Sequence, residues 1–188
     1  MDTERPQPPS PGFKPSYVVR GLPGHPIHPP LTDFTVGAYS AATVLGLLSV
    51  LGVSDENTAT AWWLTLLLAQ IVAVPTILTG FVDWLQITVG TPLWRTATAH
   101  LVANVLASAL FLVTLILGHG DYVDKEVGGL PFLLNLIAFG MLTLGGWLGG
   151  TIVFVHGMRV LRLTDEPASR AVSPVPKPEK EAAEGDGG

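Results

Sequence analysis

Four long stretches of apolar residues alternate with polar segments along the chain. Each stretch holds very few charged side chains and is long enough for about 20 residues of helix to cross a hydrocarbon core of about 30 Å. The pattern predicts an all-α integral membrane protein, an antiparallel four-helix bundle with short connections. The predicted spans are Leu31–Val53, Ala61–Leu85, Thr96–Gly118 and Pro131–Val155.

The composition strengthens this prediction. Of the 188 residues, 48% are hydrophobic and only 13% are charged, whereas a soluble domain carries about 25% charged residues. Four apolar helices in so short a chain leave no polar shell to cover them. We therefore expect the lipid bilayer to be the surrounding medium of the bundle.

The two ends of the chain have a different composition. Residues 1–23 are rich in proline, and residues 163–188 combine proline with acidic side chains. Such segments favour polyproline II or disorder. We expect disordered tails at 1–23 and 163–188 on either side of a transmembrane domain at 24–162.

Basic residues are distributed unevenly between the two sides of the predicted bundle. With four spans, both termini and the connection between spans two and three share one side. Nine of the ten lysines and arginines lie there, and the opposite side holds only Lys125. By the positive-inside rule, both termini of this multi-pass protein are predicted to be cytoplasmic.

Histidines and carboxylates gather on the predicted cytoplasmic side. His28 and Asp33 lie at the start of span one, Asp83 at the end of span two, His100 at the start of span three, and His156 at the end of span four. Ionisable residues at membrane depth are costly and often mark a site. We expect these five side chains to converge on one cavity inside the bundle.

Imidazole suggests what such a cavity would hold, because it ligates both haem iron and transition metals. For haem b, the candidate ligands are His28, His100 and His156. For a transition metal, they are His28 and His100 with Asp83 and Asp33. The aromatic side chains expected to line a haem are Phe34, Phe81, Trp84 and Phe154.

The same residue types are compatible with other roles. A proton relay needs ionisable side chains without a metal, and a structural network needs only hydrogen bonds between helices. Asn104, Gln70 and Asn135 are expected to form such bonds. The chain has no cysteine and no phosphate loop, zinc-protease helix or nucleophile elbow. It also lacks a basic patch suited to nucleic acid, so we expect neither an enzyme nor a nucleic-acid-binding protein.

Two further features concern how the helices pack. Span four carries Gly145, Gly146, Gly149 and Gly150, and small residues four apart let helix backbones approach closely in lipid. We expect this packing within the bundle, with a homodimer or other membrane subunits as the alternative. The first and third spans also begin alike, with His28 then Asp33 and His100 then Asn104, which hints at a duplicated hairpin.

Four motifs, in order along about residues 22–162, resemble the domain-of-unknown-function 2231 family. The resemblance implies a four-helix protein of the bacterial inner membrane. Some members of that family are joined to Rieske-type iron–sulfur domains, which implies an association with redox proteins. The motifs are Gly24-His25-Pro26-Ile27-His28-Pro29, Gly80-Phe81-Val82-Asp83-Trp84, the stretch from Thr98-Ala99-His100 to Asn104, and the run Gly145 to Gly150 followed by His156-Gly157.

These observations lead to two functional hypotheses. The first is a histidine and aspartate site in the cytoplasmic leaflet that binds haem b or a transition metal within a membrane redox complex. The second is a non-catalytic accessory subunit that packs against a larger membrane complex through its glycine-rich fourth span.

Overall fold

The computed structural model describes residues 14–161 and 172–173. The predicted C-terminal tail and residues 1–13 therefore lie almost wholly outside the described part. Within the predicted N-terminal tail, Tyr17–Arg20 form the short helix α1. The chain divides into two units, one of residues 28–158 and one of residues 1–27 and 159–188.

The unit of residues 28–158 is built from four long helices, each long and apolar enough to cross a membrane. The predicted all-α bundle is thus confirmed, and the described residues contain no strand. A short helix, α5 (His119–Asp124), precedes the last long helix, and a π-helical turn, η1 (Thr151–Val155), extends it. The long helices are α2 (His28–Val50), α3 (Asp55–Trp84), α4 (Pro92–Leu117) and α6 (Gly129–Gly150).

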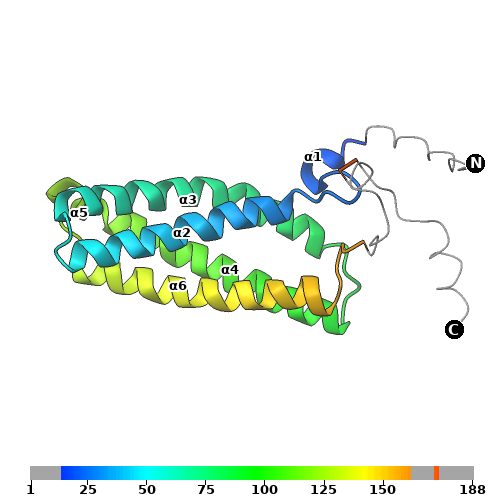
Figure 1. Ribbon diagram of the computed structural model, residues 1–188. Coiled ribbons are helices and arrows are strands. Elements are labelled where there is room, and N and C mark those ends of the chain that lie inside the picture. Colours follow the sequence, from blue (N-terminus) through cyan, green and yellow to red (C-terminus); the bar gives the residue numbers. More distant parts are fainter. Residues whose placement is uncertain (1–13, 162–171, 174–188) are drawn as a thin grey trace, which may run out of the picture. The chain divides into compact units, whose positions relative to one another are not determined.

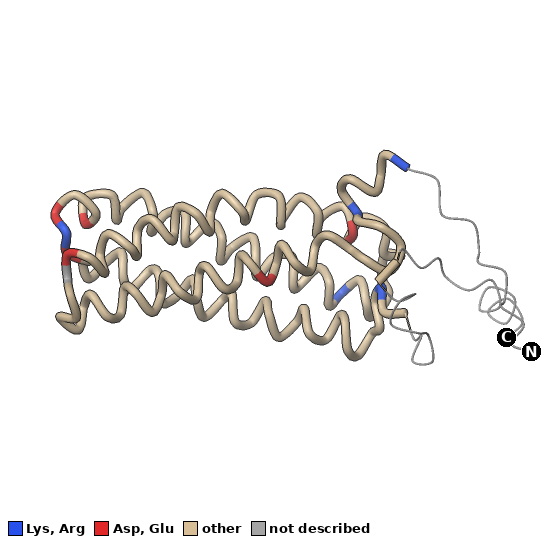
Figure 2. Tube along the Cα trace, turned by 45° about the horizontal axis from the view of Figure 1, so that its top comes forward, with Lys and Arg blue, Asp and Glu red and all other residues tan. Residues whose placement is uncertain are grey.

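Helices α2 and α3 pack side by side as one antiparallel hairpin, and α4 and α6 as a second (Figure 1). The start of α2 and the end of α6 lie at the same end of the bundle, which we call the histidine end. We call the opposite end the acidic end, because acidic residues with one lysine gather there (Figure 2). The charged residues described at the acidic end include Glu56, Asp121, Asp124, Lys125 and Glu126.

Local sequence signals explain where α4 begins and ends. The side-chain oxygen of Thr91 accepts a hydrogen bond from the backbone N–H of Trp94 at 3.1 Å, and Pro92 occupies the first turn. The threonine is a typical N-cap, because its side chain satisfies a backbone N–H that has no partner within the helix. Proline is common in the first turn because its missing N–H would have no helical partner there. Gly118 ends the helix.

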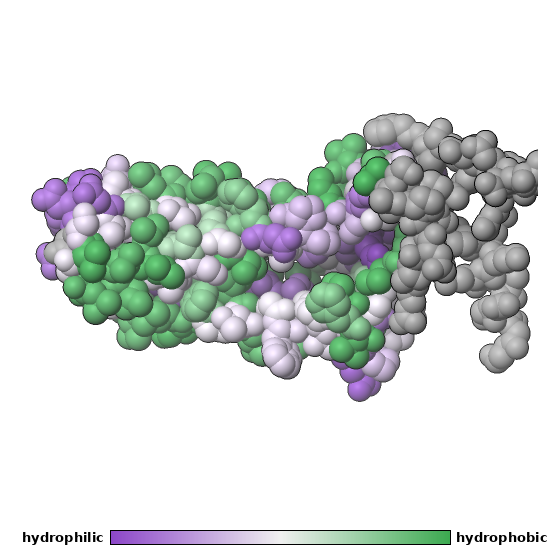
Figure 3. Space-filling model, viewed as in Figure 1, coloured by the Kyte–Doolittle hydropathy of each residue, from purple (hydrophilic) through white to green (hydrophobic). Residues whose placement is uncertain are grey.

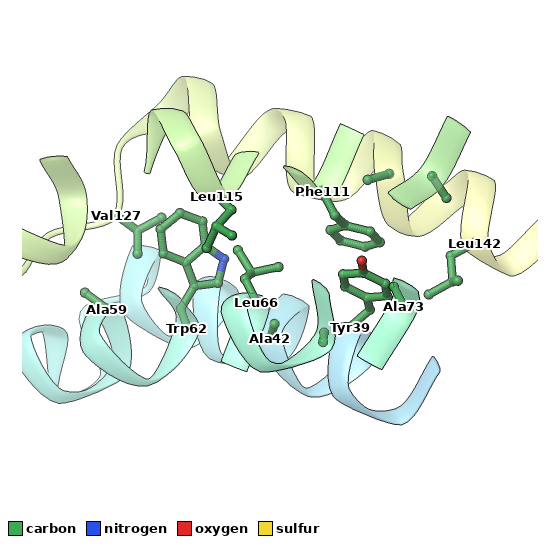
Figure 4. Packing of buried hydrophobic residues seen from close by; sticks show 13 residues of the cluster. Tyr39, Ala42, Ala59, Trp62, Leu66, Ala73, Phe111, Leu115, Val127 and Leu142 are labelled. Atoms are coloured by element: carbon green, nitrogen blue, oxygen red, sulfur yellow. The ribbon is translucent and has the colours of Figure 1, made fainter. Parts of the chain in front are cut away.

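The largest buried side chains of the bundle lie toward the acidic end. The rings of Tyr39 and Phe111 stack with their centroids 3.9 Å apart, and Trp62 and Leu66 are fully buried beside them (Figure 4). The Trp62 indole donates a hydrogen bond to Asn135, whose amide donates in turn to Thr43.

The predicted cross-helix bonds of the amides are confirmed for two of the three. Asn135 connects α6 to α2 and α3. Gln70 accepts from Tyr39 at 2.6 Å and donates to Ser108 at 3.3 Å. Asn104 differs, because its amide donates within α4 to the carbonyl of His100 at 2.8 Å.

The two hairpins repeat one another in their buried positions. Tyr39 of α2 corresponds to Phe111 of α4 (111 − 39 = 72), and Trp62 of α3 corresponds to Pro131 of α6 (131 − 62 = 69). With these two offsets, ten buried positions of one hairpin coincide with buried positions of the other, which supports a duplicated hairpin. Other positions do not coincide: Thr79 is buried, and its counterpart Leu148 is half-buried. The buried pairs are Thr35/Ala107, Tyr39/Phe111, Ala42/Thr114, Thr43/Leu115 and Gly46/Gly118, and Trp62/Pro131, Leu66/Asn135, Ala69/Ala138, Ala73/Leu142 and Thr76/Gly145.

Candidate functional site

His28 begins α2 and lies against the last turns of α3. Its Nδ1 atom is 3.1 Å from the carbonyl oxygen of Thr76 and 3.2 Å from the hydroxyl of Thr79. The ring fits because α3 has a glycine one turn further on. A Cβ atom at Gly80 would lie 2.7 Å from Cε1 of His28, closer than nonbonded carbon atoms approach.

His100 makes the equivalent contacts in the second hairpin. Its Nδ1 atom is 2.8 Å from the carbonyl oxygen of Gly145 on α6. A Cβ atom at Gly149 would lie 3.0 Å from Cε1 of His100. The imidazole therefore lies over the turn from Gly145 to Gly149, as His28 lies over the turn from Thr76 to Gly80.

The contacts of His28 and His100 are related by the same two sequence separations that relate the buried residues of the two hairpins. His100 lies 72 positions after His28 (100 − 28 = 72), and both Gly145 and Gly149 lie 69 positions after their counterparts (145 − 76 = 69, 149 − 80 = 69). Four residues after each histidine, a polar side chain donates to that histidine's carbonyl oxygen. These side chains are Thr32, at 3.0 Å, and Asn104, at 2.8 Å.

The contacts define which ring nitrogen carries the proton. A carbonyl oxygen can only accept a hydrogen bond, so Nδ1 of each histidine donates to the carbonyl in front of it. In the neutral imidazole the lone pair then lies on Nε2. Metal-ligating histidines are commonly held this way, with one ring N–H on a backbone carbonyl and the other nitrogen available to the metal.

The buried side chains of the bundle become smaller toward the histidine end. The largest fully buried side chains, among them Trp62, Leu66, Tyr39 and Phe111, lie at the Tyr39 level or nearer the acidic end. Beyond that level the buried residues are mostly small. Figure 3 shows the bundle hollowed between α2 and α6 in this half, with hydrophilic residues in the hollow. The small buried residues are Thr35, Ala73, Thr76, Thr79, Ala97, Ala103, Ala107 and Gly145.

The two predicted carboxylates lie in different surroundings. Asp83 is buried, at 8% exposure, one turn beyond Thr79 on α3. Asp33 is exposed on the surface of α2, so it does not converge with the others as expected. The inward face of α2 follows positions 28, 32, 35 and 39 at helical spacing, and position 33 is not in that series.

His156 is also separate from the matched pair. It follows the π-helical turn η1, and its Nε2 atom is 3.2 Å from the hydroxyl of Thr96 in the first turn of α4. The equivalent position in the first hairpin is Ile87 (156 − 69 = 87). His28 and His100 are thus matched between the two hairpins, whereas His156 has no matching histidine in the first hairpin.

Among the described residues, no three histidine, aspartate or glutamate side chains lie close enough together to hold a metal ion. The four predicted metal ligands, His28, His100, Asp83 and Asp33, therefore do not form a prearranged site with three protein ligands.

The expected aromatic lining is wrong for three of its four residues. Phe34 and Phe81 are exposed on the bundle surface, and Phe154 is 87% exposed. An apolar ring on the outer surface of a membrane helix can contact lipid, so an outward position carries no penalty there. Trp84 instead donates a hydrogen bond to the hydroxyl of Thr98 at 2.9 Å and fastens the end of α3 to α4.

The glycines of α6 divide between two faces. Gly145 and Gly149 lie against Asn104 and His100 of α4 inside the bundle, whereas a Cβ atom at Gly146 would have no neighbour within 4 Å. At Gly150 it would meet only the ring of Phe154, at 4.0 Å. One of the two small-residue pairs therefore packs within the bundle and the other faces outward.

Sequence reasoning did not identify Thr76 and Gly80 as the residues that seat His28. A usable signal was present, because Gly80 and Gly149 have the same spacing as Thr76 and Gly145. Backbone carbonyls are common to every residue, however, so the hydrogen-bond acceptor itself leaves no mark in the sequence.

Comparison with known proteins gives one match. Residues 24–162 match a family model described as "Predicted membrane protein (DUF2231)". No curated protein and no solved structure matches the chain.

Proposed function

The chain belongs to the DUF2231 family of predicted membrane proteins, and we propose that its bundle binds haem b between the two hairpins, where His28 and His100 would hold the iron. The observation that carries this proposal is the matched seating of the two imidazoles. Each Nδ1 lies on a backbone carbonyl of the neighbouring helix. In the neutral ring this puts the lone pair on Nε2, the atom that would bind iron. At His28 the Thr32 hydroxyl lies 3.5 Å from Nε2, so iron would replace that contact.

Haem suits this pair better than a bare metal ion does. The porphyrin supplies four nitrogen ligands, so one or two imidazoles complete the coordination of the iron. A non-haem site needs three or more protein ligands, and no such group gathers among the described residues. The small side chains of the histidine half also suit a large flat ligand, because few bulky groups must be displaced there.

The role we assign to this haem is electron transfer within a membrane redox complex. A haem held by His28 and His100 would supply one-electron redox chemistry at this site. The protein would contribute the two ring orientations and the small side chains around them, both of which tune the reduction potential. Our orientation of the helices assigns the site to the cytoplasmic leaflet.

The test is the visible spectrum of the full chain, purified in mild detergent and recorded oxidised and then reduced with dithionite. We expect the sharp reduced bands of a six-coordinate haem. His28→Ala and His100→Ala should each abolish or broaden these bands. His119→Ala is the matched control, because His119 lies at the acidic end beside Trp63.

His156→Ala separates this proposal from the earlier ligand alternatives and should leave the spectrum unchanged. Loss of the bands in His156→Ala but not in His28→Ala would reassign the ligand. A colourless protein, even after haem is supplied during expression, would reject haem binding.

A second candidate function, an accessory subunit, is favoured by the exposure of α6. Only 17% of the most apolar stretch of Gly129–Val155 is buried, against 28–33% in the other spans. A photo-crosslinking residue at Trp147, exposed on α6, should then give one discrete adduct. The same residue at Leu112, exposed on α4, should give none. Equal adducts at both positions would reject the α6 interface.

A further inference from the structure

A second candidate site lies in the unit formed by the chain segments on either side of the bundle. Its described residues are 14–27, 159–161 and 172–173, and among them there is a cavity of about 280 Å³. Tyr17, Arg20 and Arg159 contribute polar side chains to its lining, and Leu22 and Pro26 contribute apolar ones.

The cavity is built by a tight turn between its two walls. Gly21 has a φ of 78°, a left-handed conformation that favours glycine, and Leu22 and His25 pair across the turn. The Nη1 atom of Arg159 donates to the carbonyl oxygen of Arg20 at 3.0 Å. This bond holds the second guanidinium at the cavity although the two arginines are far apart in the sequence.

The charged residues described in this unit have one sign. The described residues of this unit include three basic side chains, Lys14, Arg20 and Arg159, and no aspartate or glutamate. The Nε atom of Arg20 is buried and has no hydrogen-bond partner among the described residues. A buried guanidinium N–H without an acceptor is costly, so an acceptor from a ligand would stabilise it.

We propose that this cavity binds a phosphoryl group through Arg20 and Arg159. A guanidinium presents its N–H donors as a planar fork that matches two oxygens of a phosphate. The apolar walls suit a ligand that carries hydrocarbon next to the phosphate. Residue 27 of this unit is followed directly by α2, the first membrane span, so we favour an anionic phospholipid headgroup over free phosphate as the source.

The test uses the full chain in neutral detergent micelles, with bound phosphatidylglycerol measured by native mass spectrometry. Arg20→Gln should weaken lipid binding about tenfold, or about 1.4 kcal/mol. Lys14→Gln is the matched control, because it removes the same charge from the same unit without lining the cavity. It should bind like the unaltered chain.

Arg20→Lys distinguishes fork recognition from simple attraction between charges. It keeps the charge but loses the paired donors, so its binding should fall between those of Arg20→Gln and the unaltered chain. Equal losses in Lys14→Gln and Arg20→Gln would overturn the proposal. Lipid binding of Arg20→Lys that matches the unaltered chain would overturn the assignment to the guanidinium fork.

Inorganic phosphate without lipid forms the second arm and identifies the source of the phosphoryl group. If phosphate alone raises the melting temperature of the unaltered chain but not of Arg20→Gln, the ligand is a soluble phosphate. If only phosphatidylglycerol does so, the ligand is a lipid headgroup. No response to either would overturn the site.

Discussion

At the scale of single residues, the positions of the two imidazoles depend on a glycine in the neighbouring helix. Gly80 and Gly149 have no side chain where His28 and His100 lie. Each imidazole can therefore approach the helix closely enough to reach a carbonyl one turn earlier. The same carbonyls would stay inaccessible behind an ordinary side chain.

Gly149→Ala tests this dependence. Its Cβ atom would lie 3.0 Å from Cε1 and 3.2 Å from Nδ1 of His100, so the ring must shift. Overpacking of this kind costs about 1–3 kcal/mol, and we expect the free energy of unfolding in detergent to fall accordingly. The haem spectrum should broaden as well.

Gly146→Ala is the matched control, because Gly146 lies on α6 close to Gly149 but faces outward. The added methyl group meets nothing within 4 Å, and alanine favours a helix over glycine by about 1 kcal/mol. We expect unchanged or higher stability. A Gly149→Ala protein as stable as Gly146→Ala would show that the His100 seat tolerates a side chain.

At the scale of helices, one buried amide connects three of them. Asn135 of α6 accepts from Trp62 of α3 at 3.2 Å and donates to Thr43 of α2 at 2.8 Å. Its counterpart in the first hairpin is Leu66, an apolar residue. The two hairpins therefore share a pattern of burial but not of polarity, and the hydrogen bonds in this layer are asymmetric.

We predict that Asn135→Ala lowers the free energy of unfolding by about 1–2 kcal/mol, because the Trp62 indole loses its acceptor and a small void remains. Denaturant titration of the detergent-solubilised protein measures this change. Asn57→Ala is the control, because Asn57 is exposed and its amide donates to the hydroxyl of the nearby Ser54. Similar losses of unfolding free energy in both variants would show that the hydrogen bonds of the buried amide do not stabilise the bundle.

At the scale of the whole molecule, the uneven distribution of basic residues predicts how the bundle crosses the membrane. Arg95 lies at the histidine end and Lys125 at the acidic end. The positive-inside rule then predicts that the histidine end faces the cytoplasm. A redox partner of the proposed haem would have to act from that side.

The orientation can be measured because the chain has no cysteine. A single cysteine at Gly120, at the acidic end, should react in intact cells with a maleimide that cannot cross membranes. A single cysteine at Ser10 should react only after the cells are opened. The reverse pattern would place the histidine end outside and contradict the predicted cytoplasmic termini.

The sequence by itself determined the class of fold and the number of spans. Apolar length and helical periodicity are properties of consecutive residues, so they can be read without knowing what each helix touches. The same holds for the boundaries of α4, where Thr91 and Pro92 act on their own turn. The presence of a histidine on both α2 and α4 was also evident from the sequence.

Only the tertiary structure decided which polar residues belong together. It paired His28 with Thr76 and His100 with Gly145, and it turned Asp33 outward although it lies near His28 in the sequence. It also brought Arg20 and Arg159 to one cavity. The physical reason is that these partnerships depend on the rotation and depth at which helices pack, and on backbone carbonyls that every residue shares.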